Sequence, residues 1–302
     1  MASSSRYVEP TAVALKSLHE SGTNVRSVRV AVSDLSRDEK GVLERQLRCF
    51  PSGSLVAADD LRDFAQIAYL GRDAHVSTAR LFPTIGLGQE FRNGRVLFLD
   101  SDTLVLGSLD ELATLDLDGH SVAACRDHVF PWFACPPRDS KTNWPPQGIS
   151  MDTPYFNAGI LLYDLESWSS SGYEEKILDV LNSRELEIVD QDALNIALVG
   201  SIKQLPGAYN SSNAVLTGVV ENWAGFVDTD RTLMDPLIIH YVGWPKPWSP
   251  LASPKDPHIR QWRDFARKIG VEPKWNGFSP RGILFRSLQS LKPRLVRLLK
   301  DR

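Results

Sequence analysis

Short apolar runs along the chain alternate with stretches that carry helix start and stop signals. The runs typical of buried β-strands span residues 25–33, 94–100, 121–127, 155–165 and 236–243. Helices are predicted over residues 9–22, 36–50 and 190–200. The second helix opens with a capping box from Ser36 to Glu39. This alternation, without an internal repeat, favours an α/β fold.

Three of the predicted strands deliver ionisable side chains at their carboxyl ends, namely Asp100 with Asp102, then Asp127, and His240. In open α/β sheets this edge is where ligands bind. Alternation along a strand turns Asp100 and Asp102 to the same side. Buried carboxylates are costly unless they are paired or bound to a metal. With His240 they make a plausible open site for Mn²⁺ or Mg²⁺. A lone D-x-D, however, more often begins a loop and caps a helix.

Composition narrows the class of protein. The chain has 302 residues, 42% of them hydrophobic, and a net charge of −3, which argues against a dedicated nucleic-acid binder. Its three cysteines, Cys49, Cys125 and Cys135, form no CxxC pair and suggest reduced thiols in a cytoplasmic protein. The sequence has no apolar run of 18 residues and no signal peptide at MASSSRYVEP.

Several motifs together resemble glycosyltransferase family 8, the retaining nucleotide-sugar transferases of GT-A fold that include bacterial lipopolysaccharide galactosyl- and glucosyltransferases. They occur in order over roughly residues 7–250, as HVSTARL (75–81), FLDSDTLVLGSLDEL (98–112), AACRD (123–127), YFNAGILLYDLESW (155–168), DQDALN (190–195) and HYVGWPKPW (240–248). The resemblance implies a GT-A-like Rossmannoid mixed sheet with flanking helices in residues 1–250. Residues 251–302 would form a C-terminal extension.

The resemblance also assigns roles. Mn²⁺ would be held by Asp100, Asp102 and His240. The donor nucleotide-sugar, a UDP-sugar by analogy, would be contacted by Arg80, Ser101, Lys246 and the backbone of Gly243. The transferred sugar and the acceptor would be held by Asp127, Asn157, Asp190 and Gln191. Plainer roles stay open for several of them, namely a core histidine for His240, a backbone contact for Asn157, a helix N-cap for Asp190, a surface ion pair for Arg80 and a loop cap for Asp127.

The chemistry asks for these residue types, because a leaving nucleoside diphosphate carries several negative charges that a divalent ion and Lys246 can stabilise. Gln191 is a poor nucleophile, which favours front-face attack by the acceptor hydroxyl over double displacement.

Two functions other than glycosyl transfer fit parts of the sequence. A GT-A-fold binding protein without turnover stays open. A phosphatase of the haloacid dehalogenase type is disfavoured, because Leu104 replaces the expected Thr or Val and the H-x-x-G-x-x-K-P-W segment would be unexplained.

The N-terminus departs from the family pattern. Family members begin with an apolar strand that leads to a base-contacting acid, whereas the match here begins near Arg6 and no acid stands near Ser4. We expect the first strand to be absent, through a late start or a different mode of base recognition. An absent strand would leave a sheet edge or a gap.

The C-terminal stretch 281–302 holds seven Lys or Arg against one acid, Asp301, with leucines at helical spacing and a kink predicted at Pro293. Such a helix lies on an anionic membrane surface or docks on its own domain. The first alternative predicts a peripheral protein of the inner membrane face that acts on a lipid-linked or cell-envelope glycan. Specificity is expected in the loops 128–154 and 209–223.

Overall fold

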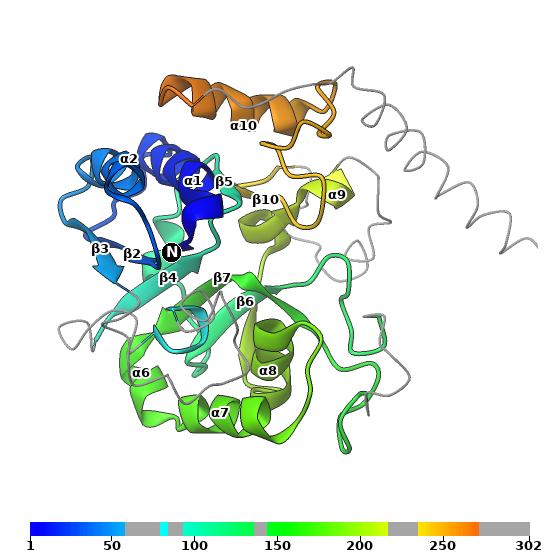
Figure 1. Cartoon of the computed structure of the whole chain (residues 1–302). Helices are drawn as coiled ribbons and strands as arrows, with labels where there is room; N and C mark the ends of the chain where they lie inside the picture. The colour runs from blue at the N-terminus through cyan, green and yellow to red at the C-terminus, as the bar shows by residue number, and fades with distance from the viewer. Residues whose placement is uncertain (58–78, 84–92, 136–143, 217–234, 272–302) are drawn as a thin grey trace, which may run out of the picture.

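Three small sheets organise the chain in the computed structural model, which describes residues 1–57, 79–83, 93–135, 144–216 and 235–271. The strand orders are β1-β2-β3, β4-β7-β6-β8 and β5-β10-β9. Figure 1 shows the first sheet beside α1 and α2, the second above α6, α7 and α8, and the third beneath α10. Parallel and antiparallel pairs occur together, so the α/β mixed-sheet prediction is confirmed.

The first sheet is parallel and consists of β1 (Ala2–Ser3), β2 (Val28–Val32) and β3 (Gly53–Ala57). The valines predicted to alternate along β2 are buried. Helix α1 (Val8–Glu20) follows a short 3-10 turn, η1 (Ser5–Tyr7). Helix α2 (Arg37–Leu47) begins at the predicted capping box, with Ser36 Oγ accepting from Glu39 N and Glu39 Oε2 accepting from Ser36 N. Local sequence therefore sets these boundaries.

The second sheet joins β4 (Arg95–Leu99), β6 (Val122–Arg126), β7 (Phe156–Asp164) and β8 (Ile202–Leu205). Strand β7 runs antiparallel to both β4 and β6, while β8 is parallel to β6. Helices α6 (Leu165–Ser170), α7 (Tyr173–Ser183) and α8 (Val189–Ala197) contribute to the core beside this sheet. Eight of the nine residues of β7 are buried, as expected for a strand with neighbours on both sides.

The third sheet contains β5 (Thr103–Val105), β9 (Ser211–Ser212) and β10 (Ile238–His240). The remaining short elements are α5 (Glu111–Thr114), η4 (Gly207–Asn210) and α9 (Asn213–Leu216). Strand β5 follows β4 after only residues 100–102. The D-x-D segment is therefore the joint at which the chain passes from the second sheet to the third.

Helix α10 (Pro257–Lys268) lies beyond the predicted boundary at residue 250 yet shares a core with the third sheet. Trp262 is fully buried and belongs to one apolar cluster with Val13 of α1, Leu104 of β5 and Ile239 of β10. The boundary itself stays a prediction. The basic stretch 281–302 lies outside the described residues, and so do residues 75–78 of one family motif.

Two expectations about the sheet edge need correction. The first strand, expected to be absent, exists as the two-residue β1, because Ala2 and Ser3 pair with Ala31 and Val32. The run 94–100 has the pattern of a buried strand, but β4 is only partly buried and, among the described strands, lies at the edge of its sheet with β7 as its partner. A cavity of about 750 Å³ is lined by residues of β2 and β4. The expected gap is therefore real.

None of the described helices has the length and apolar character needed to cross a membrane.

The first half of the predicted loop 209–223 contains regular structure. Elements η4, β9 and α9 follow one another there, up to Leu216.

Truncation of Trp262 tests whether α10 belongs to the same folding unit. Because its indole is buried against α1, β5 and β10, Trp262→Ala should lower the free energy of unfolding by about 3–5 kcal/mol in urea denaturation. Trp244, which is 57% exposed, provides the control, since Trp244→Ala should change stability by less than about 0.5 kcal/mol. An unchanged unfolding midpoint for Trp262→Ala would mean that α10 is dispensable for the fold.

Candidate active site

The D-x-D joint is held by backbone bonds to two neighbouring segments. Asp100 N donates to Gly159 O of β7 at 2.8 Å, and Tyr241 N donates to Asp102 O at 2.9 Å. Thr103 Oγ1 donates to Asp100 O at 2.8 Å, which tightens the turn itself. The direction in which the two carboxylates point is thus fixed by β7 and by the end of β10, not by the joint alone.

His240 faces both carboxylates, as the sequence predicts. Its Nε2 lies 3.3 Å from Asp102 Oδ1 and 3.7 Å from Asp100 Oδ2. One ligand atom from each of the three residues lies within 4.8 Å of the others. Two carboxylate oxygens and one imidazole nitrogen are a donor set suited to Mn²⁺ or Mg²⁺. The three residues therefore fit a divalent ion.

The other nitrogen of His240 is occupied by protein. Nδ1 lies 2.9 Å from Asn210 Oδ1, and the amide nitrogen of Asn210 donates to Asn157 Oδ1 at 2.9 Å. That second bond fixes which end of the Asn210 amide faces the histidine. An amide oxygen only accepts, so Nδ1 carries a hydrogen, and Nε2 is the nitrogen that faces the carboxylates. Nε2 is therefore the nitrogen available to a metal ion.

Two cationic side chains balance the carboxylates. The guanidinium of Arg80 bridges Asp100 and Asp190, and the ammonium of Lys246 bonds to Asp102 and to Tyr241 O. The plainer alternative for Arg80, a surface ion pair, is wrong, because its partners are two largely buried acids. Burial alone would lower the pKa of Arg80, but the charges of Asp100 and Asp190 outweigh it and raise that pKa.

The two acids of the joint differ in their affinity for a proton. Burial raises the pKa of Asp100, and the charge of Asp102 adds to this, although Arg80 opposes it. Burial acts the same way on Asp102, but His240 and Lys246 outweigh it and hold the pKa of Asp102 well below its ordinary value. Asp102 is therefore the carboxylate that is most firmly ionised.

Three of the four predicted sugar-side residues form one hydrogen-bonded group. Asp127 Oδ2 accepts from Asn157 Nδ2 at 3.0 Å and from Gln191 Nε2 at 3.1 Å. Its other oxygen accepts from the backbone of Val129 and Phe130, so it caps a turn as well. Gln191 Oε1 accepts from Ala158 N at 3.1 Å. Asp127, Asn157 and Gln191 are all at most 8% exposed.

Helix α8 presents two acids with different surroundings. Asp190 is not the N-cap, which is Ile188, and its carboxylate faces Arg80 instead. Asp192 is fully buried and accepts from Tyr155 Oη and from the backbone of Glu187 and Ile188. These contacts give Asp192 a structural use at the start of the helix.

The remaining two predicted donor residues lie apart from this group. The hydroxyl of Ser101 bonds to Ala2 O and accepts from Thr11 Oγ1 at 2.9 Å, so it faces β1 and α1. Gly243 adopts a left-handed backbone with φ of 78°, which favours glycine in the turn before Lys246.

Sequence reasoning missed two residues of the site, Gly159 and Asn210. A Cβ added at Gly159 would lie 2.2 Å from His240 Cε1 and 2.8 Å from Asp100 Oδ2, so only glycine fits behind the two ligands. Gly159 lies inside the motif at 155–168 and Asn210 inside the predicted loop 209–223. Their roles depend on which strands become neighbours, which the sequence pattern does not show.

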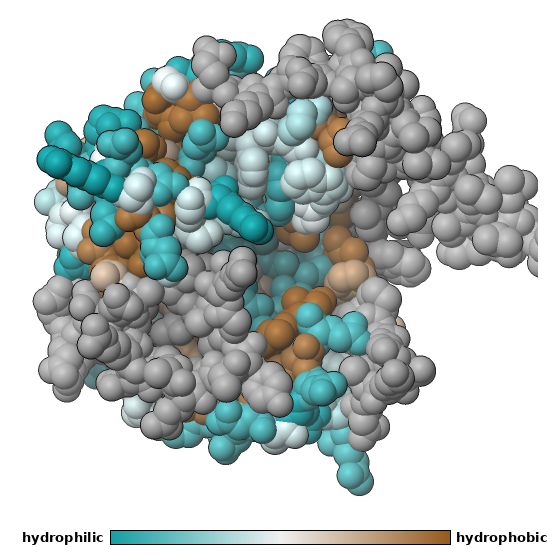
Figure 2. All heavy atoms as spheres, viewed as in Figure 1, coloured by the Kyte–Doolittle hydropathy of each residue, from teal (hydrophilic) through white to brown (hydrophobic). Residues whose placement is uncertain are grey.

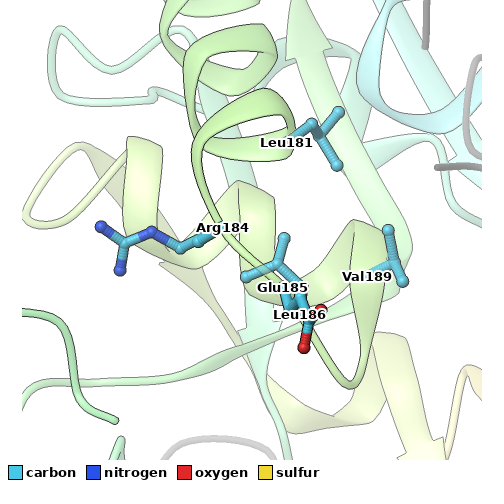
Figure 3. Close-up of a pocket in the computed structure, with 5 residues that line it drawn as sticks. All are labelled: Leu181, Arg184, Glu185, Leu186 and Val189. Atoms are coloured by element: carbon cyan, nitrogen blue, oxygen red, sulfur yellow. The ribbon is translucent and has the colours of Figure 1, made fainter. Parts of the chain in front are cut away.

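Cavities and a hollow mark the surface formed by the described residues. In Figure 2 a hollow with a hydrophilic floor lies in the same part of the view as β6, β7 and β10 in Figure 1. A small cavity of about 220 Å³ is lined by Leu181, Arg184, Glu185, Leu186 and Val189. Figure 3 shows the guanidinium of Arg184 pointing away from Leu181 and Val189. Neither this cavity nor the one bounded by β2 and β4 is lined by the acids of the D-x-D.

Residues 1–252 match the sequence family described as glycosyl transferase family 8. The chain belongs to this family. Helix α10 lies beyond the matched region, although it packs on the same core.

Curated relatives of this family member include General stress protein A of Bacillus subtilis, 27% identical over 188 residues and 60% of each chain. Lipopolysaccharide 1,2-glucosyltransferase of Escherichia coli K12 is 29% identical over 212 residues, which are 68% of this chain and 56% of that protein. The chain thus spans 56–60% of the length of these two relatives.

Solved structures agree on the fold. Galactosyltransferase LgtC, solved in complex with donor and acceptor sugar analogues, aligns with a TM-score of 0.65 at 21% identity over 90% of this chain and 96% of that one. The bifunctional glycosyltransferase WbbM, in its apo form, aligns with a TM-score of 0.68 at 21% identity over 89% of this chain and 50% of that one. The likeness supports a GT-A-like arrangement of the sheets.

Gly159→Ala should disrupt the ligand cluster. The new methyl group overlaps the imidazole of His240 and the carboxylate of Asp100, so Mn²⁺ affinity measured by calorimetry should fall at least about tenfold. Gly41→Ala on α2 is the matched control, because its methyl group meets nothing closer than 3.9 Å and should leave Mn²⁺ affinity unchanged. Equal Mn²⁺ affinities for wild type and Gly159→Ala would contradict the geometry.

Arg80→Met should leave Asp100 and Asp190 without their shared cation, which costs about 3–5 kcal/mol of stability for a buried pair. Losing Arg80 raises the pKa of Asp100 further, so the unfolding penalty should shrink as pH falls and the carboxyl takes up a proton. Urea unfolding at pH 8 and pH 5 measures both effects. Arg95→Met removes a more exposed partner of Asp164 and should cost less than about 1 kcal/mol. A penalty for Arg80→Met that is equal at both pH values would count against this charge balance.

Proposed function

We propose that the protein is a metal-dependent, retaining hexosyltransferase that moves a sugar from a nucleotide-sugar, a UDP-sugar by analogy, to a glycan or lipid-linked acceptor. One observation carries the proposal. The Asp100, Asp102 and His240 ligand atoms converge within 4.8 Å, and side-chain hydrogen bonds link His240 to the group formed by Asn157, Asp127 and Gln191. A donor diphosphate and its sugar need these two chemistries side by side.

The proposed donor half is built for an anion. A divalent ion held by the Asp-Asp-His cluster would supply Lewis-acid stabilisation of the leaving diphosphate. Lys246 at present balances Asp102, and its flexible stem lets the ammonium turn toward a phosphate oxygen once the carboxylate has another partner. Arg80 holds Asp100 and Asp190 in place and adds positive charge beside the same site.

The proposed sugar half stabilises positive charge. Scission of the sugar–phosphate bond makes the anomeric carbon oxocarbenium-like, and the carboxyl group of Asp127 and the amide oxygen of Gln191 are acceptors that favour it. The amide of Gln191 is fixed by Ala158 N and by Asp127, so its orientation costs little at the moment of reaction. An amide is a poor nucleophile, and front-face attack by the acceptor hydroxyl on the donor carbon follows as the proposed route.

The acceptor class rests on relatives. Several relatives are named as lipopolysaccharide glycosyltransferases, which supports a glycan or lipid-linked acceptor for this chain. Peripheral contact with the inner face of a membrane through residues 281–302 stays part of the proposal. The identity of the hexose is left to the donor screen.

Donor turnover tests the proposed function. Wild-type protein should release UDP from one of a panel of UDP-hexoses only when Mn²⁺ or Mg²⁺ is present, with retention at the anomeric carbon in any transfer product. Asp102→Asn should abolish release, because it removes the most firmly ionised ligand. Binding of a UDP-hexose without any release under all conditions would favour the alternative of a binding protein without turnover.

Gln191→Ala should separate binding from chemistry. The variant should lower kcat by about 10²–10³-fold while Mn²⁺-dependent UDP affinity stays near that of wild type, since Gln191 contacts the Asp127 side of the site. Asn182→Ala, on the exposed face of α7, should leave both quantities unchanged. A kcat for Gln191→Ala within about threefold of wild type would remove Gln191 from the proposed chemistry.

A further inference from the structure

Asn210 is a buried amide whose hydrogen bonds join the two halves of the site. It is the last residue of η4, is 3% exposed, and precedes β9, where Ser211 and Ser212 pair with Ile239 and His240. The backbone pairing therefore fixes the position of Asn210 relative to the histidine. Nothing in the sequence pattern had drawn attention to it.

Each functional atom of the Asn210 amide has a defined use. Oδ1 accepts from His240 Nδ1 at 2.9 Å, and Nδ2 donates to Asn157 Oδ1 at 2.9 Å. Asn157 Oδ1 also accepts from Gly159 N at 2.9 Å, and its amide nitrogen donates to Asp127. These bonds set the orientation of both amides. If the Asn210 amide were reversed, its Nδ2 donor would face the Nδ1 donor of His240, and its Oδ1 acceptor would face the Oδ1 acceptor of Asn157.

We infer that Asn210 is a positioning residue which holds Nε2 of His240 ready for a divalent ion and links that ligand, through Asn157, to Asp127 and Gln191. The inference rests on the proposed function. Ligating histidines generally donate their second N–H to a carbonyl or carboxylate, and loss of that partner weakens metal binding by about 10–100-fold. Here the acceptor is an amide that also contacts the sugar side.

Direct Mn²⁺ titration, followed by the electron paramagnetic resonance signal of the free ion, tests the inference in the full chain. Asn210→Leu keeps a similar volume but removes the acceptor, and should weaken Mn²⁺ binding by about 10–100-fold. Asn210→Asp keeps an acceptor for Nδ1–H and should recover most of the lost affinity. Asn195→Ala is the matched control, since Asn195 is 2% exposed and braces Phe156 and Gln191 through backbone contacts. It should lower stability and leave Mn²⁺ affinity unchanged.

A second measurement is made on the wild-type protein. Nitrogen-15 NMR of the metal-free protein should show a hydrogen on Nδ1 of His240, with the His240 signals assigned by their loss in His240→Gln. An Nε2–H tautomer, or an Asn210→Leu variant that binds Mn²⁺ as tightly as wild type, would overturn the inference and leave the proposed function standing. Wild-type protein that binds no divalent ion would overturn the proposed function, and the inference with it.

Discussion

Two buried carboxylates on one three-residue joint impose the constraint on which the rest of the site depends. Asp100 and Asp102 are held in this position by backbone bonds to β7 and to the residue after β10. Their charges are costly to bury without cationic partners. Arg80 and Lys246 come from distant parts of the sequence to provide them. The electrostatics of the joint thus ties the second and third sheets together.

The same arrangement explains why the site has two connected halves. His240 contacts the carboxylates with one ring nitrogen and reaches, through Asn210 and Asn157, the carboxylate of Asp127 with the other. A ligand that reorients the imidazole therefore also affects the hydrogen bonds of Asn157 and Asp127. Gly159 permits this closeness, because any side chain there would occupy the space of the imidazole.

Sequence reasoning could identify those parts of the molecule that depend on local pattern. The capping box at Ser36 and the strand ends that carry Asp100, Asp127 and His240 follow from alternation and turn chemistry, and the structure confirms them. The resemblance carried by six motifs gave the family, which the match over residues 1–252 confirms.

The features that could not be predicted from the sequence depend on pairing between strands and residues that are far apart along the chain. Among the described strands β4 pairs with β7 alone, and no local pattern shows that a strand will lack a second neighbour. Asn210 acquires its role only when β9 aligns with β10, and Gly159 only when β7 passes behind His240. The pairing of Arg80 with Asp190 joins residues 110 positions apart in the sequence.

The central claim is that the Asp-Asp-His cluster forms a working metal and diphosphate site. Thermal unfolding of wild type and Asp102→Asn with UDP, GDP, ADP and TDP, each with and without Mn²⁺, tests it most directly, because a ligand that binds only the folded state must raise the Tm. UDP should raise the Tm of the wild-type protein only when Mn²⁺ is present, and this rise should disappear in Asp102→Asn. A rise with another nucleotide alone would change the donor base and keep the site. No Mn²⁺-dependent rise with any of the four would contradict the account.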